Sequence, residues 1–395
     1  MNIQIIGRKQ IINIAYFDNA ATTFPKPEEV YTFTDKFYRE FGVNVGRGQH
    51  VLATKASSLV GETRQLLLEL NHCSDRKVVF THTATEALNT ILRGMDLPSG
   101  SNVYVSPFEH NAVMRVLHYI GEQKHLNIKE LELDRTNFLY DVEKIKYRFA
   151  DNPPNLVIVS HASNVCGVIA PIKEIFALSK QYDVVNVVDM CQTMGLIDTD
   201  LSETNVDFAV FAGHKTLYGP FGIAGFICSS NANIKPLMFG GTGIDSASRT
   251  LPNTVPERYE VGSPNITAIA GLNAALKWIN KVGIENILET ERHNHLRLLE
   301  KLREFNNIKI ISPINGENSV GVISCNFEGY ESSSIGQVLS AHDVAVRTGL
   351  HCSPDAHHYL GTFPGGSVRF SVSYFNDEND FQILHNALNY IYENS

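Results

Sequence analysis

The sequence predicts an α/β protein that has a large domain built on a mainly parallel sheet and a smaller α+β domain. Short apolar runs rich in Val and Ile alternate with helical patterns up to about residue 265, which is typical of a doubly wound sheet. Several runs are apolar throughout, as expected for strands that helices cover on both faces. After residue 265 the pattern changes to long helices and short strands. We therefore predict a large domain over 15–265 and a small domain over 266–395, with residues 1–14 packing against the small domain.

The strands expected in the large domain are Val78–Thr81, Asn102–Ser106, Leu156–Ser160, Val184–Val188, Phe208–Phe211 and Ile223–Cys228. Helical patterns lie between them. In Pro27–Phe41, Val30, Phe33 and Phe37 recur at helical spacing on one stripe. Thr85–Arg93 is expected to end before Gly94, because glycine favours the end of a helix.

The small domain is expected to begin with two long helices, Ile266–Val282 and Ile284–Phe305. Its strands are expected at Ile308–Ser312, Ser319–Asn326, Val344–Arg347 and Ser367–Ser373. A helix from Asp377 to about Tyr392 is expected to close the chain.

Composition excludes several classes of protein. The chain of 395 residues has 33 Lys and Arg against 42 Asp and Glu, a net charge of -9, which argues against nucleic-acid binding. It has no apolar run long enough to span a membrane and no signal-peptide pattern, so we expect a cytoplasmic protein. Its 6 cysteines are scattered without a C-x-x-C pair or zinc spacing, so we expect no metal site.

The strongest local signal is a lysine, Lys215, in a glycine-rich turn directly after the strand Phe208–Phe211. A lysine near a buried strand end can lose its charge and act as a nucleophilic amine, as lysines that form Schiff bases do. The alternative is a surface lysine whose stem packs at a turn.

The second signal is Asp189, which follows the strand Val184–Val188. The carboxyl ends of strands are where open α/β sheets bind ligands. An aspartate there can pair with the protonated pyridine nitrogen of pyridoxal phosphate (PLP), or it can simply cap the next helix. The spacing from Asp189 to Lys215, across one strand, is what PLP enzymes of the aspartate-aminotransferase fold type need.

A third, weaker signal is the strand-to-helix turn Thr81–Glu86. Small residues there would let backbone N–H groups at a helix N-terminus hold a phosphate. The alternative is a threonine that caps the helix and has no ligand.

Several ordered motifs together resemble the class V aminotransferase superfamily. They are the segments at 18–23, 109–111, 160–164, 189–192, 214–215 and 347–352. Within this superfamily the chain is similar to the cysteine desulfurases, on the Suf-pathway side, and the resemblance runs from about residue 15 to residue 390. It implies the PLP-dependent aspartate-aminotransferase fold (fold type I).

The resemblance implies a set of cofactor contacts. Lys215 would bind PLP covalently, and Asp189 would pair with the pyridine nitrogen. Gln192 and Asn164 would contact the phenolic oxygen. His110 would stack on the ring and could move protons.

The resemblance also implies how the phosphate is held. Ala84, Thr85 and His214 would contact it directly. Ser263 stands where the family often has a threonine that reaches the phosphate of the partner subunit, so a homodimer is expected.

Substrate contacts follow from the same resemblance. Arg369 would grip the substrate carboxylate by a bidentate contact, with Asn164 nearby and Arg347 ordering the site. Cys352 would be the nucleophile that accepts sulfur.

Cys352 also stands out by its neighbours. It lies in a polar loop with His351, His357 and His358, and protonated imidazoles lower the pKa of a nearby thiol. The alternative is a small buried hydrophobe, the usual fate of a free cysteine. The other five cysteines are expected to be structural.

The sequence departs from the family pattern near the cofactor. Ala212 stands where a serine or threonine usually offers a hydroxyl to the phosphate, and Met190 and Cys191 replace a usual small pair. Cys191 is expected close to the cofactor, where its bulk would change the tilt of the ring.

The resulting hypothesis is a PLP-dependent cysteine desulfurase that converts L-cysteine to L-alanine and passes sulfur through a Cys352 persulfide to an acceptor protein. A selenocysteine lyase or another PLP-dependent C–S lyase would use the same residues. An aminotransferase would give Cys352 no task. The departures at Ala212, Met190 and Cys191 also leave open a non-catalytic sulfur-relay scaffold.

Overall fold

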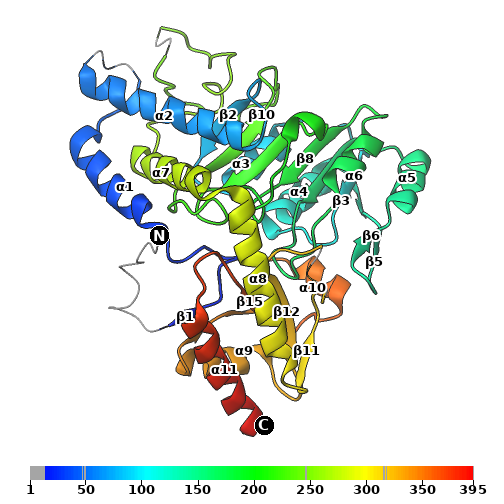
Figure 1. Cartoon of the computed structure of the whole chain (residues 1–395). Coiled ribbons are helices and arrows are strands. Elements are labelled where there is room, and N and C mark those ends of the chain that lie inside the picture. Colours follow the sequence, from blue (N-terminus) through cyan, green and yellow to red (C-terminus); the bar gives the residue numbers. More distant parts are fainter. Residues whose placement is uncertain are drawn as a thin grey trace.

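The computed structural model describes residues 14–46, 48, 50–244, 247–314, 316 and 318–394. The chain forms two bodies, each with its own sheet, and Figure 1 shows helix α8 running from one body to the other. The prediction that residues 1–14 pack against the small domain falls almost entirely outside the described residues.

A sheet of seven strands forms the centre of the larger body, in the order β2-β10-β9-β8-β7-β3-β4. These strands are β2 (Lys77–Thr81), β3 (Asn102–Val105), β4 (Asn127–Glu130), β7 (Leu156–Ser160), β8 (Val185–Asp189), β9 (Phe208–Ala212) and β10 (Ala224–Cys228). Strand β10 is antiparallel to both neighbours, and the pairings among the other strands are parallel. The predicted α/β class with a mainly parallel sheet is confirmed.

Helices cover both faces of this sheet. The helices of the larger body are α1 (Glu28–Phe41), α2 (Val51–Leu70), α3 (Ala84–Gly94), α4 (Asn111–Lys124), α5 (Val142–Asp151), α6 (Ile172–Ser179) and α7 (Ile266–Val282). Along β7, Val157 and Val159 join the core formed with α1, α2 and α5 to α7, whereas Leu156 and Ile158 join the core formed with α3 and α4. Alternate side chains of one strand thus feed two apolar layers, which explains the continuous apolar runs.

The smaller body is built on a sheet of four strands in the order β11-β12-β15-β14, with every pairing antiparallel. Its strands are β11 (Ile308–Ile310), β12 (Val322–Phe327), β14 (Arg347–Gly349) and β15 (Ser367–Ser371). Its helices are α8 (Ile284–Arg303), α9 (Ser332–Ala341), α10 (Pro354–Leu360) and α11 (Glu378–Glu393).

Two short strand pairs and one turn of 3-10 helix complete the described chain. Strand β1 (Ala15–Tyr16) pairs in parallel with β13 (Val344–Ala345), and β5 (Leu133–Asp134) pairs with β6 (Leu139–Tyr140). Residues Leu201–Glu203 form a turn of 3-10 helix.

The packing bears on where the two domains divide. Helix α7 lies against α1 and α2 of the larger body, and Ala15 and Phe17 are buried in the core of the smaller one. The division at residues 265 and 266 stays a prediction. We propose instead that the boundary falls at the junction of α7 and α8, with the segment around β1 belonging to the smaller body.

Several element ends differ from their predicted positions. The predicted strand Val344–Arg347 is two strands, β13 and β14, which belong to different sheets. Gly94 is the last residue of α3 rather than the residue beyond it, and the chain leaves the helix at Met95. The strand predicted from Ser319 begins at Val322, because Ser319 forms only an isolated bridge with Val168.

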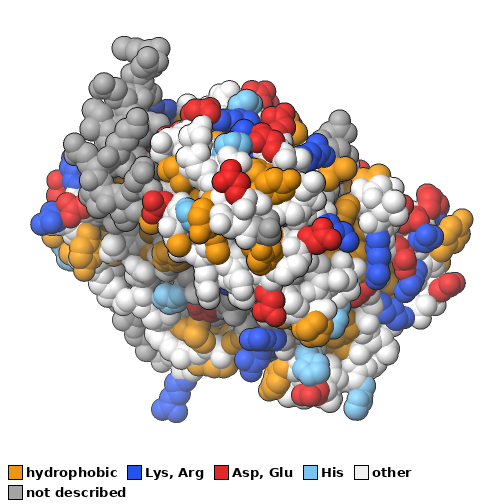
Figure 2. All heavy atoms as spheres, turned by 90° about the horizontal axis from the view of Figure 1, so that it is seen from below, with side chains coloured by type: hydrophobic (Ala, Val, Ile, Leu, Met, Phe, Trp, Pro, Cys, Tyr) orange, Lys and Arg blue, Asp and Glu red, His pale blue; other side chains and the backbone are white. Residues whose placement is uncertain are grey.

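The surface carries charges of both signs, intermixed with apolar side chains, on the face drawn in Figure 2. None of the helices in the described part of the chain combines the length and apolar character needed to cross a membrane.

Candidate active site

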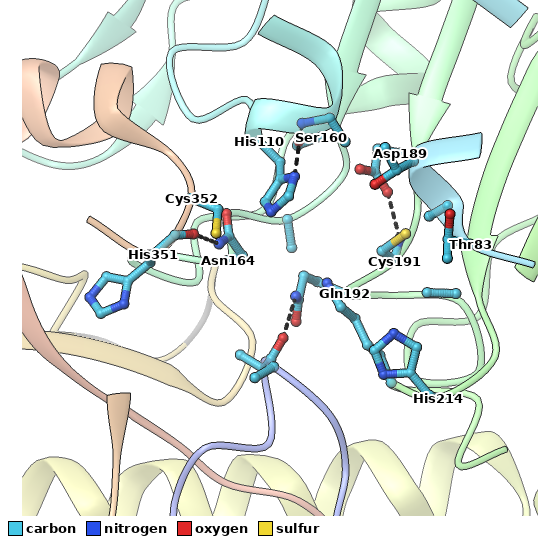
Figure 3. A pocket seen from close by; sticks show the side chains of 18 of the residues that line it. Thr83, His110, Ser160, Asn164, Asp189, Cys191, Gln192, His214, His351 and Cys352 are labelled. Carbon is cyan, nitrogen blue, oxygen red and sulfur yellow. Dashed lines mark hydrogen bonds between the residues drawn. The ribbon is translucent and has the colours of Figure 1, made fainter. Parts of the chain in front are cut away.

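A cavity of about 280 Å³ opens at the carboxyl ends of the parallel strands of the larger body, next to the smaller body. The predicted site residues that line it are Ala84, Thr85, His110, Asn164, Asp189, Gln192, His214, Lys215, Arg347, Cys352 and Arg369. In the view of Figure 3, Cys352 and Asn164 lie on one side of the cavity and Asp189 and Cys191 on the other. Ser263 does not line this cavity and is exposed in the segment before α7, so its role toward a partner subunit stays a prediction.

Asp189 is the last residue of β8 and is 9% exposed. Its Oδ1 accepts a hydrogen bond from the backbone N–H of Cys191 at 2.9 Å. Residues 191–196 form turns and not a helix. Asp189 therefore caps no helix, and its carboxylate stands at the wall of the cavity.

Lys215 follows β9 and faces the same cavity. The carbonyl of Lys215 accepts hydrogen bonds from the Thr23 hydroxyl at 2.9 Å and from the Tyr218 backbone N–H at 2.8 Å. These bonds fix the turn, and the side chain is half-buried in the cavity wall and not free on the surface. Lys215 and Asp189 thus enter one cavity from adjacent strands.

The segment before α1 holds the carbonyl of His214. The Thr22 hydroxyl donates to this oxygen at 2.9 Å, the Thr23 backbone N–H at 3.2 Å and Lys26 Nζ at 2.6 Å. Burial lowers the pKa of Lys26 to about 7. The segment that begins at Asp18 therefore fixes the turn that carries His214 and Lys215. The sequence did not indicate this contact.

His110 is the N-cap residue of α4, and its Nδ1 accepts the Ala112 backbone N–H at 3.0 Å. Burial and the positive charge of Lys215 lower the pKa of His110 to about 4. The ring is therefore neutral at physiological pH. Because Nδ1 is an acceptor, the single ring proton lies on Nε2.

Glu109, directly before His110, is fully buried and holds two strand ends together. It accepts hydrogen bonds from the Ser106 hydroxyl at 2.6 Å, the Ser160 backbone N–H at 2.6 Å and the Ser160 hydroxyl at 2.8 Å. Burial raises the pKa of Glu109 to about 7. Glu109 thus connects the loops after β3 and β7, both of which reach the cavity.

The N-terminus of α3 forms another wall of the cavity. The Thr83 hydroxyl accepts the Glu86 backbone N–H at 3.1 Å, so Thr83 caps the helix, and the phosphate contact stays a prediction. The first N–H groups of a helix have no partner within the helix. Those of Ala84 and Thr85 therefore remain available at the cavity, where a helix N-terminus favours an anion.

His214 adds a second feature to that wall. Its Nδ1 is buried and has no hydrogen-bond partner among the described residues. Its ring stacks on Phe221 with centroids 4.6 Å apart. Burial and the charges of Lys215 and Lys26 lower the pKa of His214 to about 3.

Two arginines enter from the smaller body. Arg347 on β14 and Arg369 on β15 are directly opposite each other across the strand pair. Arg369 is 1% exposed, its Nη2 pairs with Asp18 Oδ1 at 2.6 Å, and its Nη1 donates to the Asn164 carbonyl at 2.9 Å. Its buried Nε has no partner in the described part of the chain. Like charges opposite each other destabilise a sheet, so this pair marks a place suited to an anion.

Cys352 is the one exposed cysteine of the six. It lies in a turn between β14 and α10 with a φ of 58°, a backbone conformation that residues other than glycine rarely adopt. Its carbonyl accepts the Asn111 backbone N–H at 2.7 Å, and Arg347 Nη2 lies 3.6 Å from Sγ. The sulfur is therefore held at the mouth of the cavity beside a positive charge, and the buried-hydrophobe interpretation is wrong.

The histidines near Cys352 do not have the predicted role. His351 and His357 are buried, with rings 5.4 Å apart. Burial lowers the pKa of His351 to about 2 and that of His357 to about 4. Neutral imidazoles do not stabilise a thiolate by charge, so the prediction that they activate Cys352 is wrong for these two rings. The cation beside the sulfur is Arg347.

The three residues that depart from the family pattern lie in different places. Ala212 and Cys191 line the cavity, as predicted for Cys191, whereas Met190 is buried in the core behind it.

Asn164 donates from Nδ2 to the His351 carbonyl at 2.8 Å, and Gln192 donates from Nε2 to the Ala20 carbonyl at 2.9 Å. No group of three or more His, Cys, Asp or Glu side chains in the described part could hold a metal ion.

Comparison with known proteins matches this chain to one family and to relatives with similar names. Over residues 15–384 the sequence matches the family described as aminotransferase class-V. A probable cysteine desulfurase of Pyrococcus abyssi is 32% identical over 372 residues, which cover 92% of this chain and 90% of the relative. A probable cysteine desulfurase of Xylella fastidiosa is 30% identical, covering 93% of this chain and 88% of the relative.

Solved structures agree. The apo cysteine desulfurase of Thermococcus onnurineus superposes with a TM-score of 0.89 at 26% identity, covering 97% of this chain and 95% of that one. The cysteine desulfurase CsdA of Escherichia coli, in an S-sulfonic acid form, gives a TM-score of 0.85 at 25% identity, covering 96% and 95%. This chain belongs to the aminotransferase class-V family.

Proposed function

We propose that this protein is a PLP-dependent cysteine desulfurase, which converts L-cysteine to L-alanine and takes up the sulfur on Cys352. The observation that carries the proposal is one cavity lined by Lys215, Asp189 and an exposed thiol beside Arg347. An aminotransferase needs the first two residues but gives no task to an exposed cysteine at the mouth of its site.

The cavity residues fit PLP. An acid at the end of β8 suits the pyridine nitrogen, and the buried unpaired Nδ1 of His214 together with the N-terminus of α3 suits the phosphate. Lys215 lies on a third wall, from which its amine would hold the cofactor covalently. When bound, PLP supplies an electron sink for the substrate's Cα.

The residues of the chain have distinct tasks in this proposal. Lys215 Nζ would move the proton of the substrate's Cα. His110, whose ring is neutral, would stack on the cofactor and would keep a proton on Nε2 for transfer to the substrate. Asn164 and Gln192 would contact the cofactor's phenolic oxygen, and Ala212 would offer no hydroxyl to the phosphate.

The two arginines would bind the substrate carboxylate. Arg369 keeps an unpaired Nε while Asp18 and Asn164 hold its other nitrogens. Its side chain is therefore fixed before the substrate arrives, and a fixed guanidinium binds a carboxylate with little loss of side-chain entropy. Arg347 adds positive charge on the side of the sulfur.

The sulfur step uses Cys352. Its thiolate attacks the sulfur of the substrate, an S–S bond forms as the Cβ–S bond breaks, and alanine leaves after Cβ is protonated. The persulfide then passes its outer sulfur to a thiol of an acceptor. We further propose that the enzyme acts in the cytoplasm as a homodimer, with Ser263 reaching the phosphate site of the partner subunit.

The test is to purify the protein with PLP, record the visible absorbance, and measure alanine and sulfide formed from L-cysteine in the presence of dithiothreitol. We expect a bound-cofactor band and one alanine per sulfide. Lys215→Ala should lose the covalent band and turnover. Near-normal alanine formation by this variant would contradict the proposal, and a strong preference for selenocysteine over cysteine would favour a selenocysteine lyase.

A further inference from the structure

A second hollow of about 650 Å³ begins at Cys352 and runs outward over helices α3 and α4. It shares Thr85, His110, Ala112 and Cys352 with the cofactor cavity, so the two hollows are continuous. We call it the α3–α4 groove. A reactant lying in it reaches the thiol along α3 and α4.

The walls of the groove are formed by one face of α3 and one face of α4. Asn89 and Arg93 are four residues apart on α3, and Arg115 and Tyr119 are four apart on α4. Residues at that spacing lie on one face of a helix. Thr85 and Arg93 are eight residues apart on α3 and both line the groove, so the rise of the helix gives the groove a length of about 12 Å, which suits a short extended segment of chain.

The groove is positively charged in a chain whose net charge is -9. No described residue that lines it is acidic. Arg93 and Arg115 are exposed, and neither forms an ion pair with another described residue. The Arg93 guanidinium lies 5.5 Å from the centre of the Tyr119 ring, an arrangement that holds the charge in place while leaving its N–H groups free.

The two hollows suit two different reactants. The substrate carboxylate is assigned to Arg369 and Arg347, and the α3–α4 groove adds more volume than the cofactor cavity itself. The proposed reaction has a second reactant, the thiol that removes sulfur from Cys352. This thiol must reach Sγ while the persulfide is present, and the groove provides that approach.

We propose that the α3–α4 groove binds an acidic segment of the protein that accepts sulfur, with the acceptor cysteine next to its negative charges. The inference rests on the proposed function. The acceptor thiolate attacks the outer sulfur of the Cys352 persulfide, a new S–S bond forms on the acceptor, and the old S–S bond breaks. Its electron pair returns to Cys352 as a thiolate, so that no outside reductant is needed.

Charge complementarity predicts a rate effect. Opposite charges around an interface mainly raise the rate of association, and salt weakens the effect. Removing both arginine charges should therefore slow transfer to an acidic acceptor and leave transfer to a neutral one unchanged.

The experiment uses the PLP-loaded enzyme and two synthetic peptides, each with one cysteine, flanked by glutamates in one and by glutamines in the other. Sulfur transfer from the Cys352 persulfide is followed by mass spectrometry for wild type, for the double variant Arg93→Gln with Arg115→Gln, and for Arg292→Gln. Arg292 is an exposed arginine on α8 and serves as the control.

We expect the double variant to transfer sulfur to the glutamate peptide about five- to tenfold more slowly at low salt. We expect no change with the glutamine peptide, with the control variant or at high salt. Equal rates for both peptides in the wild type would overturn the inference. A change of the double variant from dimer to monomer in sedimentation would also overturn it, by assigning the groove to a second copy of the chain.

Alanine formation with dithiothreitol as the acceptor separates this inference from the proposed function. Normal alanine formation with equal peptide rates would overturn only the inference. Absence of alanine in the wild type would overturn the proposed function itself.

Discussion

Arg369 is the residue on which the proposed substrate site depends most. Its guanidinium is buried, and burial lowers its pKa despite the neighbouring Asp18. The pairing with Asp18 joins residues 351 positions apart in the sequence. No local pattern indicates such a contact, so the sequence suggested the role of Arg369 only through the family resemblance.

Replacing Asp18 by Asn should destabilise the protein. Asp18 is partly exposed, but removing its charge leaves the buried Arg369 guanidinium uncompensated, which costs about 3 kcal/mol, the low end of the range for a buried pair. Urea denaturation should show this loss, and the KM for cysteine should change as Arg369 loses its fixed orientation. Asp35→Asn is the matched control, because its ion pair with Arg39 is exposed, and it should leave both quantities unchanged. A stability of Asp18→Asn equal to that of the control would contradict the account of this pair.

Other site residues could be predicted because each directly follows a strand. Asp189 ends β8 and Lys215 follows β9, so the sequence indicated both. The contact of Arg347 with Cys352 could not be predicted, because it depends on the left-handed turn at His351 and Cys352. The histidines were misjudged because the sequence does not show that His351 and His357 point into the interior.

At the scale of elements, helix α8 connects the turn that follows Lys215 to the smaller body. Glu291 on α8 accepts a hydrogen bond from the Tyr218 hydroxyl at 2.6 Å, and the Tyr374 backbone N–H donates to the same hydroxyl at 3.2 Å. Tyr218 lies in the turn that follows Lys215. One buried network thus ties the lysine turn, α8 and the segment after β15 together.

Glu291→Gln should change the pH dependence of stability. Burial raises the pKa of Glu291 to about 7 from an ordinary value near 4.5. The folded state therefore holds this proton more tightly than the unfolded state, and the stabilisation is fully present below pH 4.5 and lost as the pH rises through about 7.

The measurement is the free energy of unfolding of wild type and variant in urea at several pH values. Relative to wild type, Glu291→Gln should gain stability as the pH rises across this window, with a slope of up to about 1.4 kcal/mol per pH unit. Glu289→Gln, an exposed change on the same helix, should show no such slope. A constant difference between Glu291→Gln and wild type would mean that Glu291 ionises normally.

Strand prediction succeeded where a run is apolar and failed where direction or sheet membership matters. The strand β7 was predicted at its observed bounds. The reversed direction of β10 was not indicated, because an apolar run reads the same in either direction. The segment around Val346 looked like one strand, but β13 and β14 on either side of it pair with different sheets.

At the scale of the whole molecule, folding buries five of the six cysteines and leaves Cys352 exposed. Burial raises the pKa of Cys73 and Cys166 to about 11 and that of Cys228 to about 12, and it also raises the pKa of Cys191 and Cys325. These thiols stay protonated and buried in the folded protein, Cys191 in the wall of the cavity, whereas Cys352 is exposed.

Iodoacetamide should therefore modify only Cys352 in the native protein at mildly alkaline pH, and all cysteines after unfolding. Peptide mapping by mass spectrometry gives the sites. Modification of Cys191 at a rate similar to that of Cys352 would show that the cavity wall opens to solvent.

The central claim is that Cys352 takes sulfur from cysteine in a PLP-dependent reaction. The most direct measurement is mass spectrometry of the PLP-loaded protein after it reacts with an equimolar amount of L-cysteine without reductant. The account predicts one added sulfur atom on the Cys352 peptide, one alanine released per sulfur bound, and no added sulfur or alanine in Cys352→Ala, whose cofactor band should persist. Alanine formation by Cys352→Ala at the wild-type rate, or added sulfur on a different cysteine, would contradict it.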